Sequence, residues 1–445
     1  MRWRKTVFAG VIFLSVWLAL LVRESATEDQ ESQRLSLDLS TAVARALQEN
    51  PDLTAKRQAL GVAQGRVQQA ELLFQENPRL SVDTDFRNRR FTQPAGRSGA
   101  DVEVRLLQEI EIAGQRGYRR EAAAKQLAQA KWLITDAERL LRLEVTQGFY
   151  ELLALQEKLT VQQEMLATQE ALLQAGLTRF DRGDISVLEL DTLRLDRDQT
   201  RSELTSREEE KVRKEHQFRL LLGFGDQPAL QLVGSFSAMS SPVRSVQPPS
   251  RESIEVCAME HRPDIQAARL VLEGREAELR LAQARRIPNI SFGPLYKLDN
   301  EDQVIGGALS IPLPFFNRNQ HEITAAMANL QVSRTELEAR ILAVKHEGNA
   351  VSSRLQLATR QLDSYGTAYL DGLTEGISFA RKAYESGEIT IFEFSVTLDR
   401  LVQARFRYLE AVLAYLQAWV ELDAKTAFQC LDKNGSEVHR QENKE

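Results

Sequence analysis

A heptapeptide that occurs twice decides the fold of this chain, as Phe180-Asp-Arg-Gly-Asp-Ile-Ser186 and again as Tyr384-Glu-Ser-Gly-Glu-Ile-Thr390. The central glycines of the two copies are 387 − 183 = 204 residues apart. A second phrase, Asn50-Pro-Asp52, returns as Arg262-Pro-Asp264 with its proline 263 − 51 = 212 residues later. A period this long indicates a duplicated half of a domain, not the short unit of a solenoid.

Long helical segments flank the repeated phrase in both halves. No proline occurs between Gln115 and Arg182, and the apolar residues of this segment follow a near-heptad pattern that is typical of long packed helices. A helix of about 65 residues is about 100 Å long, more than a compact globule of this size needs. We therefore predict a mainly α fold with a small β part. Its long helices are expected at 114–182, 185–222, 319–386 and 389–428.

Two pairs of segments with alternating apolar and polar residues precede the long helices, and they predict strands at 79–92, 101–113, 288–299 and 303–314. Strands of about ten residues match the span of a tilted transmembrane strand. Four such strands cannot close a barrel, so several copies of the chain must pool their strands. A small sheet outside any membrane is the alternative. The residues expected to face lipid are Leu80, Val82, Phe86, Val102, Val104, Ile290 and Phe292.

The two ends and the middle of the chain differ in composition from the repeats. Basic residues followed by the apolar run 7–22 predict a signal peptide at 1–26, with an uncleaved anchor as the alternative because Glu24 weakens the cleavage site. The two repeats are expected at 35–224 and 251–431. A proline- and serine-rich linker at 225–250 separates them, and the polar tail 432–445 is expected to be disordered.

Nothing in the sequence indicates an active site. There is no P-loop, nucleophile elbow or dinucleotide fingerprint, and the five histidines are dispersed without metal-ligand spacing. We expect no enzyme activity, no cofactor and no metal site. A net charge of −6 does not favour nucleic acid as a partner. Cys257 and Cys430 are the only cysteines; a disulfide is possible in an oxidising compartment, but we expect two unpaired thiols.

Three motifs then identify a family. They are LQEIEIAGQR at 107–116, RPDIQAA at 262–268 and LSIPLPFFNRNQ at 309–320. Together and in this order they resemble the TolC-like outer-membrane efflux proteins, and within them the CzcC-like branch that serves heavy-metal efflux. The resemblance covers nearly the whole chain after the signal peptide.

The resemblance implies a homotrimer in the outer membrane of a Gram-negative bacterium. Three chains would share a twelve-stranded β-barrel in the lipid, continued by an α-helical barrel through the periplasm. Such proteins are passive exit ducts that dock on a periplasmic membrane-fusion adaptor and an inner-membrane RND pump, here with heavy-metal cations as the expected substrate. An outlet for drugs or for type I protein secretion is an alternative, and so is a periplasmic coiled-coil adaptor or scaffold.

The same resemblance places the repeated glycine phrase at the periplasmic tip, where a reversal of the chain favours glycine. The residues that it assigns to adaptor docking are Gly183, Ile185, Leu188, Gly387, Ile389 and Thr390. Glu393 matches a position that lines the closed aperture, with Glu189 as its counterpart in the first half. Val396 and Ile389 depart from the family's closing network, and an ordinary surface role for Glu393 is the alternative.

Overall fold

The computed structural model describes residues 35–87, 99–225, 230–234, 236, 250–299, 302–366 and 368–427. The signal peptide expected at 1–26 and the tail expected at 432–445 lie outside these residues. Those two assignments stay predictions.

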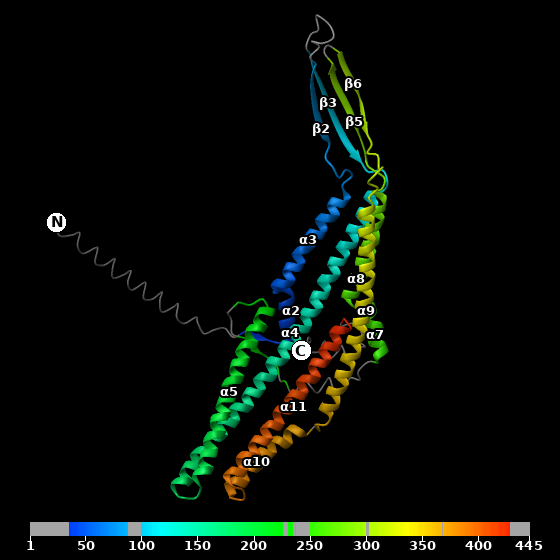
Figure 1. The fold of residues 1–445 in the computed structure, drawn as a ribbon. Helices are drawn as coiled ribbons and strands as arrows, with labels where there is room; N and C mark the ends of the chain where they lie inside the picture. The colour runs from blue at the N-terminus through cyan, green and yellow to red at the C-terminus, as the bar shows by residue number, and fades with distance from the viewer. Residues whose placement is uncertain are drawn as a thin grey trace, which may run out of the picture.

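The longest element is α4, which spans Gln115–Asp181 and has 67 residues. No proline interrupts it, and glycines with positive φ stand at both ends, Gly114 (75°) and Gly183 (80°). At 1.5 Å per residue this helix is about 100 Å long. In Figure 1 it runs from the base of a sheet to the tip of a helical hairpin.

Each half of the chain contributes two shorter helices and then a long hairpin (Figure 1). Helix α3 packs along α4, α8 packs between α4 and α9, and α11 contacts both α4 and α9. The mainly α fold is thus confirmed. The helices are α2 (Leu39–Glu49), α3 (Pro51–Glu71), α4 (Gln115–Asp181), α5 (Val187–Leu221), α7 (Arg251–His261), α8 (Pro263–Ala284), α9 (Gln320–Asp363), α10 (Tyr369–Ser386) and α11 (Ile391–Lys425).

A four-stranded antiparallel sheet in the order β2-β3-β5-β6 stands at the opposite end from the hairpin tips (Figure 1). Each half supplies one hairpin of two strands. Strands β3 and β5 pair in the middle, so β2 and β6 are the two edges. Its strands are β2 (Arg79–Arg87), β3 (Gly99–Ile110), β5 (Ile290–Asp299) and β6 (Asp302–Ser310).

The main apolar core lies where α4, α9 and α11 run together. The near-heptad pattern predicted for α4 contributes Val145 and Leu152, and α11 contributes Leu409 and Leu416; all four side chains are buried. Burying a side chain of this size contributes about 1.5–3 kcal/mol. Among the described residues, no helix combines the length and apolar character needed to cross a bilayer.

One expected helix is broken. Instead of a continuous helix over 319–386, α9 ends at Asp363 and α10 begins at Tyr369. Gly366 falls in the break, where it lowers helix propensity. The rings of Tyr365 and Tyr369 both contact the ring of Tyr408 on α11, at centroid distances of 5.5 and 5.9 Å. These ring contacts pack the break against α11, whereas α4 continues without interruption.

The segment 225–250 is not only a linker. Strand β4 (Leu230–Leu232) lies within it and pairs in parallel with β1 (Leu35–Leu37). Phe236 is buried in the main core. A parallel pair of three-residue strands from distant segments leaves no periodicity in the sequence, which explains why the prediction missed it.

The expectation of two unpaired thiols is wrong. Cys257 is disulfide-bonded, and the chain has a single other cysteine, Cys430, which lies outside the described residues. The fold supplies the reason, because the Cys257 Sγ lies 3.9 Å from the carbonyl oxygen of Thr426, directly after α11. Helix α7 thereby reaches the end of the last helix.

Candidate functional site

The two hairpin tips repeat one backbone design. Gly183 and Gly387 have φ of 80° and 81°, a left-handed conformation that side chains with a Cβ disfavour. Just beyond each glycine an amide closes the preceding helix: Asp184 N donates to the Arg179 carbonyl at 2.9 Å and Glu388 N donates to Ala383 at 2.8 Å. This is the hydrogen bond of a Schellman motif.

A capping box starts the next helix at both tips. The Glu393 Oε2 accepts hydrogen bonds from the Thr390 amide (2.8 Å) and hydroxyl (3.0 Å), and the Thr390 Oγ1 accepts from the Glu393 amide (3.2 Å). Ser186 and Glu189 make the same three bonds. The backbone amides of Thr390 and Ser186 lower the pKa of Glu393 and Glu189 respectively.

Both aperture candidates therefore have a structural role as well. Sequence reasoning missed it, although the pattern of Ser or Thr followed three residues later by Glu is a known signature of a helix start. Glu393 remains exposed. Its carboxylate is therefore ionised and open to solvent at the start of α11.

The residues expected to dock an adaptor fall into two groups. Gly183, Gly387, Thr390 and Leu188 are exposed, and the Leu188 side chain is 78% accessible. Ile185 and Ile389 instead pack partly against a small core between the hairpins. The buried members of this core are Leu172, Leu173, Leu190, Leu193, Ile391 and Phe394.

Two further exposed apolar residues at the tips were not among the predicted docking residues. Val187 and Phe392 are 59% and 48% accessible. The duplication could have found Phe392, since Leu188 and Phe392 occupy corresponding positions of the two capping boxes. Each tip therefore presents an apolar side chain beside an ionised glutamate.

The predicted strand phase agrees with the register of the sheet. Leu80 pairs with Leu106 and Val82 with Val104 across β2 and β3, and Val104 pairs with Tyr296 of β5. The apolar candidates thus share one face of the sheet, on which Leu80, Val82 and Phe292 are at least half accessible. The side chain of Phe86 lies outside the described part of the chain.

The opposite face of the sheet is polar. Arg105 forms ion pairs with Glu103 and, at 3.5 Å, with Asp83 of β2. Lys297 of β5 pairs with Asp299 at 3.4 Å. The sheet of the protomer thus has one apolar face, one charged face and two edge strands, β2 and β6, that are each paired on one side only.

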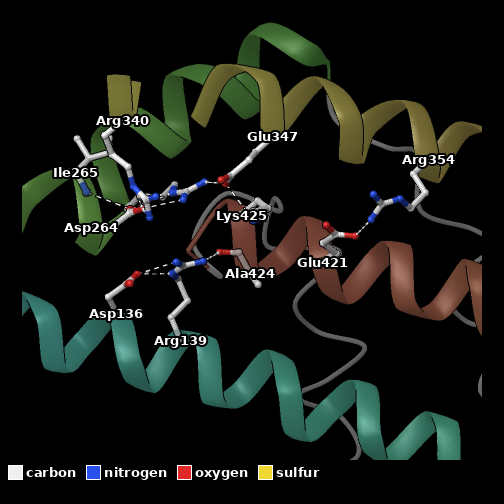
Figure 2. Close-up of polar contacts among 11 residues, drawn as sticks. Asp136, Arg139, Asp264, Ile265, Arg340, Glu347, Arg354, Glu421, Ala424 and Lys425 are labelled. Carbon is white, nitrogen blue, oxygen red and sulfur yellow. Dashed lines mark hydrogen bonds and ion pairs between the residues drawn. The ribbon is translucent and has the colours of Figure 1, made fainter. Parts of the chain in front are cut away.

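The Arg-Pro-Asp phrase builds a buried ion network beside the end of α11 (Figure 2). Arg262 Nη2 donates to Asp264 at 2.8 Å and Arg262 Nη1 to Glu347 of α9 at 2.8 Å. Arg340 Nε donates to the same aspartate at 2.8 Å. Lys425 at the end of α11 donates to Glu347 at 3.0 Å. The network ties α8, α9 and α11 together.

The electrostatics of Asp264 follow from these partners. Burial alone would raise its pKa, but the hydrogen bonds and positive charges of Arg262 and Arg340 outweigh burial and lower the pKa to about 2. A third arginine lies in the same region on α4: Arg139 donates to the Ala424 carbonyl at 2.9 Å and pairs with Asp136 (Figure 2). The phrase at 262–264 therefore has a structural role.

With the geometry established, comparisons with known proteins give the family. The sequence model of the family "outer membrane efflux protein" matches residues 42–224 and 256–427. The chain belongs to the outer membrane efflux protein family. The predicted resemblance is thus confirmed, and this family membership places the protein in the outer membrane of a Gram-negative bacterium.

Two relatives of known sequence are instructive. The cobalt-zinc-cadmium resistance protein CzcC of Cupriavidus metallidurans is 24% identical over 395 residues, which cover 87% of this chain and 89% of that protein. The cation efflux system protein CusC of Escherichia coli K12 is 29% identical over 224 residues, 47% of either chain.

Solved structures share the fold. A crystal structure of CusC superposes with a TM-score of 0.67 at 20% identity and covers 87% of this chain and 91% of its own. A membrane protein from Pseudomonas aeruginosa gives a TM-score of 0.72 at 19% identity, with 89% and 94% covered. Within the described residues, no group of three or more His, Cys, Asp or Glu side chains is arranged to hold a metal ion.

Proposed function

We propose that this efflux protein is the outer-membrane exit duct of a tripartite system and conducts heavy-metal cations passively to the exterior. The observation that carries the proposal is a four-stranded sheet with one apolar face and two free edges, joined to long helices, of which α4 is about 100 Å long. The sheet suits a lipid bilayer and the helices suit a tube that reaches across an aqueous compartment.

The assembly that fits this geometry is a homotrimer. The strands have 9, 12, 10 and 9 residues, close to the 9–11 residues of a tilted transmembrane strand. Four strands are too few to enclose a pore, because about eight are the smallest number that closes well. Three chains supply twelve strands, and the free edge of β6 on one chain then meets β2 of the next.

The tips are the proposed contact with a periplasmic membrane-fusion adaptor and, through it, an inner-membrane RND pump. Leu188 and Phe392 offer apolar surface there, and each lies next to a tight reversal at a glycine. A rigid tip that exposes apolar side chains beside a charge has the composition of a protein interface. Gly183, Gly387 and Thr390 lie at the surface of the same reversals.

Heavy-metal cations are the proposed substrate class. Its support is the likeness to a protein named for cobalt, zinc and cadmium resistance and to a second named for cation efflux. The exposed carboxylate of Glu393 adds to this support, since three copies around a pore axis would attract cations. Metal ions are cargo in this proposal, and the duct itself needs no resident metal.

The test is deletion of the gene in its own host, with measurement of cell-associated Co²⁺, Zn²⁺ and Cd²⁺ during external exposure. We expect metal accumulation to rise and to return to normal when the gene is restored. Unchanged metal content together with increased retention of a fluorescent drug would favour a drug outlet. Purified protein that gives no conductance in planar bilayers would favour a scaffold or an adaptor.

A further inference from the structure

The loop that joins β6 to α9 carries a group of strongly exposed apolar side chains. Phe316 is 95% accessible and Phe315 is 70% accessible, and Leu313 and Ile311 are also exposed. Single exposed apolar residues are common, but four within six residues form a patch that marks an interaction site.

The two phenylalanines line an open hollow of about 490 Å³ between the end of α8 and the start of α9. Its remaining lining residues are Arg286, Arg318, Gln320, Ile323 and Thr324. Two arginines and no carboxylate thus border a hollow with an aromatic wall. Its composition suits an amphipathic ligand with an anionic group.

Within the described part of the chain, no carboxylate neutralises the positive charge of this hollow. The neighbouring Glu322 is engaged elsewhere, because it accepts from Asn319 at 2.9 Å and pairs with Arg285 at 3.4 Å. Arg318 donates through Nε to the Pro314 carbonyl at 3.3 Å, which leaves its two terminal nitrogens available. Arg286 has no side-chain partner among the described residues.

The loop continues the apolar face of the sheet toward the helices. Leu309, near the end of β6, pairs with Phe292 and so shares the face of the predicted lipid contacts. Ile311 and Leu313 follow at intervals of two residues, and all three are exposed. In Figure 1 the loop lies where the sheet meets the helices. That junction is the periplasmic boundary of the membrane if the sheet is the transmembrane part.

We propose that this hollow binds the headgroup of an anionic phospholipid in the periplasmic leaflet of the outer membrane. Arg286 and Arg318 contact the phosphate, while Phe315 and Phe316 lie at the boundary between headgroups and acyl chains. Arginine suits phosphate through its planar set of donors, and outer-membrane barrels have girdles of aromatic residues at both interfaces. The proposal rests on the proposed function, because it needs the sheet to lie in the membrane.

Charge favours a lipid over a second copy of the chain as the occupant. In the proposed trimer, β6 of one copy adjoins β2 of the next, and β2 begins at this level with Arg79. A neighbouring chain therefore brings another cation toward Arg286 and Arg318. An anionic headgroup instead neutralises the cluster.

The binding test compares the purified full-length trimer with the double variant Arg286→Gln/Arg318→Gln. Phosphatidylglycerol is titrated into detergent, and the shift in the midpoint temperature of trimer dissociation is measured against phosphatidylcholine and inorganic phosphate. The matched control is Arg182→Gln/Arg334→Gln, which removes two exposed arginines away from the hollow. We expect parent and control to respond alike and the double variant to need at least tenfold more phosphatidylglycerol.

Three results would overturn the inference. One is an equal response of the double variant and the parent. Another is a phosphate response as large as that of the lipid, which would indicate a free-anion site. The third is loss of the trimer in the double variant without added lipid, which would assign the hollow to a subunit contact. A parent protein that never forms a membrane-embedded trimer would instead refute the proposed function.

A spectroscopic measurement locates the lipid directly. Phe316→Trp places an indole at the hollow, and brominated phosphatidylglycerol quenches indole fluorescence on contact. We expect stronger quenching of this variant than of the parent, with the added quenching lost when Arg286→Gln and Arg318→Gln are combined with it. Quenching no stronger than that of the parent would exclude lipid at this position.

Discussion

Val82→Arg is the substitution that tests most directly whether the sheet lies in lipid. Val82 is the fourth of nine residues in β2, pairs with Val104 across the ladder and is 56% accessible in the protomer. Replacing such an exposed side chain leaves no cavity, so the protomer itself should fold normally. The cost arises only when the apolar face enters the membrane.

The expected free-energy cost of inserting the variant trimer into the membrane is large, because each of the three copies contributes to it. An arginine near the midplane on the lipid face costs about 2–4 kcal/mol, so three copies cost about 6–12 kcal/mol per trimer. The control is Asp83→Arg on the polar face, where an arginine stands opposite Glu103 and gives up an exposed pair with Arg105. Exposed pairs of this kind contribute about 0–1 kcal/mol.

The other neighbour of Val82 is a poorer control. Ser81 stands directly opposite Arg105 across the ladder, whereas residue 83 stands directly opposite Glu103 and only diagonally to Arg105. An arginine at position 81 would therefore create the closer like-charge pair. The assay is the yield of heat-modifiable trimer in the outer-membrane fraction, measured at equal expression. Asp83→Arg should assemble like the parent and Val82→Arg should assemble poorly. Equal yields would refute the assignment of the apolar face to lipid.

Three further predictions address the tips and the ion network. Gly183→Trp and Gly387→Trp should abolish efflux and leave the trimer intact. A Cβ added at either glycine meets no neighbouring atom within 4 Å, so the bulk falls on the tip and the strain of the positive φ stays within the turn. Normal metal efflux in both variants would argue against docking there. Glu393→Gln should weaken cation selectivity in planar bilayers at low salt, since glutamine can still close the capping box but carries no charge. Glu189→Gln is the internal control. If both variants have the same reversal potential as the parent protein, Glu393 is only a helix cap. The fold lowers the pKa of Asp264 from 3.8 to about 2, so its carboxylate should contribute about 2 kcal/mol of stability above pH 4 that is lost as the pH falls toward 2. The unfolding temperature of Asp264→Asn should lack this pH dependence. If the unfolding temperature of the variant depends on acid pH as that of the parent does, the network is contradicted.

Most of the helical architecture could be predicted from the sequence, because its cause is local. A proline-free segment with a heptad seam can only be a long helix, and α4 (Gln115–Asp181) is within one residue of the expected bounds at each end. The reversals at Gly183 and Gly387 were also foreseeable, since both need positive φ. The period of two in the strands fixed which residues share the apolar face.

Contacts between distant segments could not be predicted. At the break between α9 and α10, Tyr365 and Tyr369 pack against Tyr408 of α11, a contact between distant segments that Gly366 alone does not predict. The disulfide of Cys257 depends on α7 meeting the end of α11. The pairing of β1 with β4 joins residues 230 − 35 = 195 positions apart.

The sequence by itself determined that this protein has two copies of one plan, built from long helices and strands with one apolar face. Those features follow from periodicity, and periodicity is a property of neighbours in the chain. Only the tertiary structure decided what the Arg-Pro-Asp phrase does. Arg262 pairs with Glu347, which lies 85 residues later in the chain. The packing of the helices brings the two side chains together, and no spacing in the sequence predicts such a pair.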